Sequence, residues 1–61
     1  MKKYLIVGET GHGPDELLYD TDDSLCAEIR LAVELGRGAD AYMVTEYSDE
    51  YADSLIDMRV P

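Results

Sequence analysis

The chain is short of basic residues, and this shortage excludes whole classes of ligand. Of its 61 residues only 5 are Lys or Arg, against 14 Asp or Glu, so the formal net charge is -9. Because proteins bind phosphate backbones through Lys and Arg, the composition excludes direct binding to nucleic acid. Anionic membrane surfaces would repel the same acidic protein, so membrane binding is excluded as well.

Other absences limit the kinds of site that the chain can form. Cys26 is the only cysteine, so no internal disulfide can form, and no signal-length apolar stretch follows the N-terminus; together these predict a cytoplasmic protein. No apolar run approaches the roughly 20 residues needed to cross a bilayer. His12 is the only histidine and lies far along the chain from Cys26, which matches neither a zinc site nor a nucleophile and its base. We therefore expect no metal, no cofactor and no enzymatic activity.

Enough apolar residues are present for the chain to fold. Hydrophobic residues make up 46% of the sequence, which is too many for a disordered acidic tail. A chain of this size can enclose one small core. We expect a single domain over residues 1–61, with one helix on one small sheet.

The first half of the sequence predicts two strands and a helix. Residues 3–8 contain a short apolar run and end at a Gly-rich segment, and residues 16–20 form a second short strand, so the two make a hairpin. Residues 21–24 then offer several N-capping side chains. Apolar residues recur at helical spacing from Leu25 to Val33, and Gly36 follows, which predicts a helix over 23–35.

The spacing of apolar and polar residues in 42–60 decides which topology the sequence predicts. Apolar and polar residues alternate in 42–46 and 55–60, which favours two strands joined by a loop at 48–53, with Met43 opposite Met58. The fold class is then α+β, a small antiparallel sheet packed on one helix in the order ββαββ. The alternative is a second helix over 49–58, capped by Ser48, which gives the order ββαβα.

The aromatic residues are all tyrosines, and several lie among acids in the last third of the chain. Tyrosine offers rigid contact area, and neighbouring carboxylates can bind Arg and Lys by charge-assisted hydrogen bonds. We predict a partner-binding surface made by Glu46, Tyr47, Asp49, Glu50, Tyr51, Asp53 and Asp57.

Two further groups are candidates for interaction. A second acidic cluster contains Asp15, Glu16, Asp20, Asp22 and Asp23, some of which also suit helix capping. In addition, Leu5, Val7 and Leu18 are expected to share the sheet face away from the helix. This apolar strip would be exposed unless another chain covers it, which is compatible with a homodimer.

These features predict a non-catalytic acidic module that binds a basic protein surface. The expected partner is a nucleic-acid-binding host enzyme or defence complex, and the carboxylates stand in for phosphates, as in a DNA mimic. In length, charge and element order the chain resembles the small phage-encoded proteins that block host polymerases, repair enzymes or defence nucleases. That resemblance implies an inhibitor that acts against host defence. The alternative is a structural, accessory or antitoxin-like subunit that dimerises through its sheet and binds a partner by hydrophobic contacts.

Overall fold

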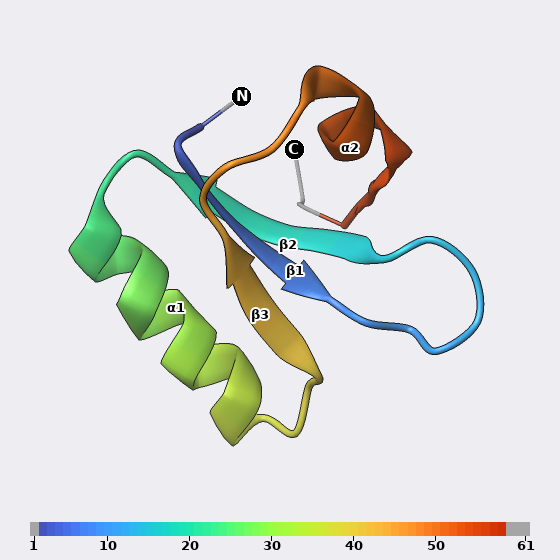
Figure 1. Ribbon diagram of the computed structural model, residues 1–61. Coiled ribbons are helices and arrows are strands. Elements are labelled where there is room, and N and C mark those ends of the chain that lie inside the picture. Colours follow the sequence, from blue (N-terminus) through green and yellow to red (C-terminus); the bar gives the residue numbers. More distant parts are fainter. Residues whose placement is uncertain (1, 59–61) are drawn as a thin grey trace.

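Four strands form one sheet, and a helix lies on each of its faces in the computed structural model, which describes residues 2–58 (Figure 1). The elements are β1 (Tyr4–Gly8), β2 (Glu16–Thr21), α1 (Ser24–Gly36), β3 (Ala41–Val44), α2 (Asp49–Ser54) and β4 (Ile56–Asp57). The strand order is β3-β1-β2-β4. The predicted α+β class and the order ββαββ are confirmed. The sheet is mixed and not wholly antiparallel as predicted, because β1 runs antiparallel to β2 and β3 whereas the short β4 runs parallel to β2.

The predicted hairpin between the last two strands is wrong. The Ser48 hydroxyl accepts a hydrogen bond from the Tyr51 backbone N–H at 3.1 Å and so begins α2, the helix of the alternative prediction in a shorter form. This helix carries the chain across one sheet face, so β4 reaches the β2 edge instead of lying beside β3 (Figure 1). Met43 pairs with Ile6, and the Met58 backbone N–H bonds to the Leu17 carbonyl at 3.1 Å. Residues 59 and 60 of the predicted strand lie outside the described residues.

The sheet face that was expected to be exposed is the main core of the protein. Leu5 and Val7 are fully buried, and Leu17 lies beside them. Tyr42 and Val44 of β3 lie beside this cluster in the same sheet, and Tyr47, Tyr51 and Leu55 of the following segment pack against it. The prediction of an apolar strip open to another chain is therefore wrong, because α2 and its flanking segments already occupy it.

Leu18 does not share that face. The β1–β2 register shifts between Ile6 and Val7, which pair with Tyr19 and Leu17 respectively, so Leu18 is the extra residue of a β-bulge. A shift of one residue moves a side chain to the other side of the sheet, and Leu17 takes the place that was predicted for Leu18.

The opposite sheet face lies under α1. Ile6 is fully buried there, paired with Tyr19 and Met43, and Ala27 of α1 is buried as well. The helix begins at Asp23, whose side chain accepts hydrogen bonds from the Leu25 and Cys26 backbone N–H groups. Each sheet face is thus covered by one helix, and the exposed acids lie on the loops, on both helices and on β4.

Candidate interaction surface

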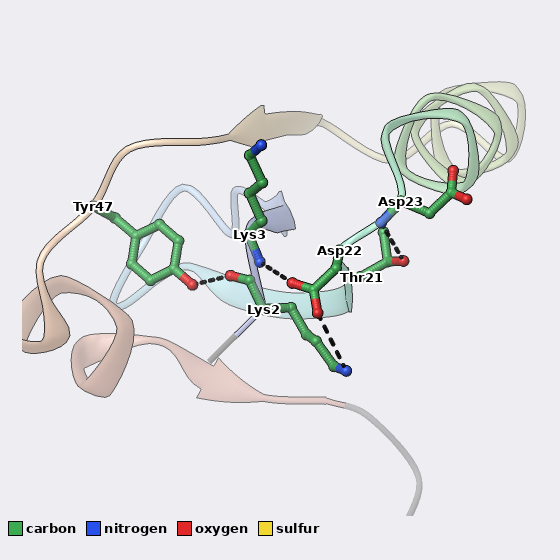
Figure 2. A network of polar contacts seen from close by, with 6 residues as sticks. All are labelled: Lys2, Lys3, Thr21, Asp22, Asp23 and Tyr47. Atoms are coloured by element: carbon green, nitrogen blue, oxygen red, sulfur yellow. Dashed lines mark hydrogen bonds and ion pairs between the residues drawn. The ribbon is translucent and has the colours of Figure 1, made fainter.

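The loop between β2 and α1 meets the N-terminal segment through Asp22. One carboxylate oxygen of Asp22 accepts the Lys3 backbone N–H at 2.8 Å, and the other lies 3.6 Å from the Lys2 ammonium (Figure 2). The hydrogen bond from Lys3, together with the positive charge of Lys2, holds the pKa of Asp22 below its usual 3.8. Asp22 therefore remains ionised at neutral pH and ties the chain's beginning to this loop.

Tyr47 joins the same network from the other side. Its hydroxyl donates a hydrogen bond to the Lys2 carbonyl oxygen (Figure 2). Loss of hydration raises the pKa of Tyr47, and the negative charges of Asp20, Asp22 and Asp49 raise it further. Asp20 lies near the end of β2, Asp22 in the loop after it and Asp49 at the start of α2, so negative charges from two stretches distant in sequence act on one tyrosine hydroxyl.

The acids of α2 extend this surface. Asp49 and Glu50 lie in its first turn, and Glu46, Asp49, Glu50 and Asp53 are all exposed to solvent. Glu46, Glu50 and Asp53 form no ion pair with any residue in the described range 2–58. We call this surface the acidic edge, and its members are Asp20, Asp22, Glu46, Asp49, Glu50 and Asp53.

The two tyrosines predicted for partner binding mainly serve the core. Tyr47 and Tyr51 are half-buried and pack against the Leu5, Val7 and Leu17 cluster, with their ring centroids 6.5 Å apart. The hydroxyl of Tyr51 lies 3.3 Å from that of Tyr42. Their rings hold α2 on the sheet, so most of the groups that a partner could reach at this edge are carboxylates.

The structure divides the second acidic cluster. Asp15 and Glu16 lie at the start of β2, roughly 14 Å along the strand from Asp20. Asp15 is engaged within the fold: its carboxylate accepts the Tyr42 hydroxyl at 2.6 Å, and its carbonyl accepts the Ile56 N–H at 2.9 Å. Asp23 caps α1. Of the five predicted acids, only Asp20 and Asp22 join the acidic edge.

The remaining predicted residue, Asp57, is exposed on β4 at the outer edge of the sheet. His12 lies in the exposed β1–β2 loop with its Nδ1 2.8 Å from the Thr10 carbonyl oxygen. Among residues 2–58, no three His, Cys, Asp or Glu side chains are grouped so that they could hold a metal ion. Within the same range, no helix has both the length and the apolar character needed to cross a bilayer.

One exposed feature escaped the sequence analysis. Leu25, Ile29 and Val33 of α1 are 62%, 56% and 46% exposed, so the apolar stripe of this helix faces away from the sheet. Their spacing was visible in the sequence, but a spacing alone does not say which way a helix turns.

Comparison of the chain with protein-family models, with curated proteins and with solved structures finds no match in any of the three.

Proposed function

We propose that this protein is a non-catalytic binding module whose acidic edge occupies a basic surface on a partner protein. In its most specific form the partner is a nucleic-acid-binding enzyme or defence complex, and the carboxylates take the place of phosphates, as in an inhibitor of the phage type. The observation that carries the proposal is the group of exposed acids on and before α2, next to the network that joins Tyr47 and Asp22 through the Lys2–Lys3 segment.

The cations of the described residues leave most of this charge uncompensated. Arg30 and Arg37 both lie against Glu34 of α1, with N–O distances of 3.5 and 3.3 Å. Lys3 Nζ lies over the Tyr4 ring. Lys2 is paired with one member of the acidic edge, namely Asp22. A basic partner would therefore gain ion pairs with Glu46, Glu50 and Asp53 without first having to displace a described cation.

The spacing of the α2 acids suits recognition by several cations at once. Residues three and four apart on a helix hold their Cβ atoms about 5–6 Å apart, which applies to Glu50 with Asp53 and to Asp49 with Asp53. Such a row offers closely spaced negative charges to the Arg and Lys side chains of a phosphate-binding groove. All of these acids are open to water, an environment that suits ion pairing more than acid–base catalysis.

The test begins with capture of partners. Tagged protein is incubated with nuclease-treated cell lysate at low and high salt, and the captured chains are identified by mass spectrometry. We expect salt-sensitive capture of a basic nucleic-acid-binding protein, from which a DNA duplex displaces this protein. Capture that is indifferent to salt and to DNA would overturn the proposal.

Matched variants then test the acidic edge itself. Glu46→Gln, Glu50→Gln and Asp53→Asn together remove three charges from the edge, and we expect them to weaken binding of the captured protein by about tenfold or more. The control combines Glu9→Gln, Glu28→Gln and Asp40→Asn, which removes three charges from other exposed positions. Equal losses in the two triple variants would show that net charge alone matters and that the edge is not the site.

A cytoplasmic location belongs to this proposal. Cys26 is an exposed free thiol, which suits a reducing compartment.

A second candidate function is that of an assembly subunit, favoured by the exposed apolar stripe of α1. Its contact would lie on this helix, because the sheet face first expected to dimerise is covered by α2.

A further inference from the structure

The helix α1 is turned so that its apolar side faces solvent. On its inner side Ala27 is buried, and so is the charged Glu34. On its outer side Leu25, Ile29 and Val33 are between 46% and 62% exposed, and the small residues Cys26 and Ala32 beside them are exposed too. We call these five residues the outer face of α1. An amphipathic helix normally directs such a stripe into a core, so this one is left without a partner within residues 2–58.

We propose that the outer face of α1 is the contact of a symmetric homodimer, in which the α1 helices of two copies pack antiparallel about a two-fold axis near Ile29. Leu25, Ile29 and Val33 are four residues apart and form one ridge along the helix. In an antiparallel pair centred on Ile29, Leu25 of each copy lies opposite Val33 of the other. The same patch then serves both partners, as a two-fold interface requires.

The charges at the two ends of α1 determine the orientation. Asp22 and Asp23 precede the helix, and Arg37 follows it with its side chain 69% exposed. Antiparallel packing brings Arg37 of each copy toward the acidic end of the other helix and opposes the two helix dipoles. Parallel packing would instead bring Arg37 toward Arg37 and the aspartates toward each other.

The charge of the outer face favours a second copy over a basic partner. Although the chain carries -9, the solvent side of α1 holds one exposed acid, Glu28, since Glu34 is buried between Arg30 and Arg37. A basic segment would therefore find little to pair with here. A second copy presents the same apolar ridge, which packs against this one without needing an ion pair.

A hollow beside the ridge formed by Leu25, Ile29 and Val33 can accept a side chain from the facing helix. It measures about 200 Å³ and is lined by Tyr19, Cys26, Ile29, Arg30 and Val33. This volume lies below the roughly 300–1,000 Å³ of typical small-molecule sites, so an aliphatic side chain from the facing helix is the better occupant. The apolar ridge is separate from the acids of α2, because α1 and α2 lie on opposite faces of the sheet (Figure 1).

Sedimentation velocity over a range of protein concentrations tests the dimer. We expect a concentration-dependent dimer that strengthens with added salt, because salt screens the repulsion between two copies of charge -9. Ile29→Glu places two carboxylates at the axis and should weaken the dimer by more than about tenfold. The matched control is Ile56→Glu, the same substitution at a residue that is 46% exposed on β4, and it should leave the dimer intact. Circular dichroism verifies that both variants fold.

Cysteine cross-linking tests the orientation. In the antiparallel pair the two Cys26 residues are offset by six positions, or about 9 Å along the axis, which is too far for a disulfide. Wild-type protein should therefore resist mild oxidation, whereas Ile29→Cys combined with Cys26→Ser should form a covalent dimer. Rapid disulfide formation through Cys26 would show parallel packing and overturn the proposed arrangement.

Three outcomes, two from sedimentation and one that adds capture of partners from lysate, would overturn the dimer itself. One is a monomer at concentrations up to about 1 mM. A second is equal loss of the dimer in Ile29→Glu and Ile56→Glu. The third is a monomer whose Ile29→Glu variant, but not Ile56→Glu, loses a partner captured from lysate, because the outer face would then belong to a different chain.

Discussion

At the scale of single residues, two tyrosine hydroxyls and a carboxylate meet where α2 crosses the sheet. The Tyr42 hydroxyl donates to Asp15 at 2.6 Å and lies 3.3 Å from the Tyr51 hydroxyl. The hydrogen bond to Asp15, followed by that with Tyr51, raises the pKa of Tyr42 far above its usual 10.0. The three groups join the start of β2, β3 and α2 by polar contacts at the border of the main core.

We expect Tyr42→Phe to lower the free energy of unfolding by about 1–2 kcal/mol, because it leaves a partly buried Asp15 carboxylate without its donor. Urea unfolding at neutral pH measures the loss. Tyr4→Phe is the control, since it removes the hydroxyl of another half-buried tyrosine for which no hydrogen bond is found within residues 2–58. Equal losses in both variants would contradict the role of the Asp15 bond.

The same tyrosine sets an alkaline limit to stability. Its pKa is raised in the folded state, so its contribution is complete below the unfolded value near 10.0 and is lost as the pH rises above that value. We expect the free energy of unfolding to fall above about pH 10, and to fall less steeply in Tyr42→Phe. Urea unfolding between pH 8 and pH 11 measures both slopes. Identical slopes would show that Tyr42 is not the group responsible.

At the scale of elements, the short helix α2 determines how the last third of the chain is used. It has 6 residues, too few to be stable alone, and it depends on the Ser48 cap and on the burial of Ala52. Once formed, it holds Tyr51 and Leu55 over the main core and displays Glu50 and Asp53 outward. One helix therefore stabilises the core and presents the acidic edge.

We expect Ser48→Ala to cost about 1 kcal/mol of stability, because the Tyr51 N–H loses its partner. Ser48→Asp should retain most of the stability, since a carboxylate also caps. Ser24→Ala, at the exposed first position of α1, serves as the control. The measurement is the urea midpoint followed by circular dichroism, and a loss in Ser24→Ala as large as that in Ser48→Ala would argue against the cap.

At the scale of the whole molecule, net charge opposes folding. A chain of 61 residues with a net charge of -9 repels itself when compact, because its 14 acids face only 5 Lys and Arg. Salt should relieve the repulsion, because the Debye length shortens from about 30 Å at 0.01 M to about 3 Å at 1 M.

We therefore expect the melting temperature to rise between these two salt concentrations, measured at one fixed protein concentration because association also contributes to stability. The triple variant Glu46→Gln, Glu50→Gln, Asp53→Asn should show a smaller rise, since it carries three fewer negative charges. A melting temperature that falls with salt would mean that pairs such as Lys2–Asp22 outweigh the general repulsion.

Local patterns in the sequence were sufficient to predict the strands β1 and β2 and the helix α1. The apolar run before Gly8 and the acidic caps before Leu25 act on residues close in the chain, so their outcome needs no knowledge of the fold. The alternation in residues 55–58 was misleading, because β4 spans Ile56–Asp57 and the capped helix before it decided where the chain could go.

The sequence by itself determined the acidic charge, the α+β class and the residues that carry the negative charge. Only the tertiary structure decided which segments meet, because Asp22 and Tyr47 are both joined to the Lys2–Lys3 segment, and the β2 bulge replaced Leu18 with Leu17 in the core. It also decided that the apolar ridge of α1 faces outward. A helical period specifies which residues share a face, but the direction of that face depends on packing across the whole sheet.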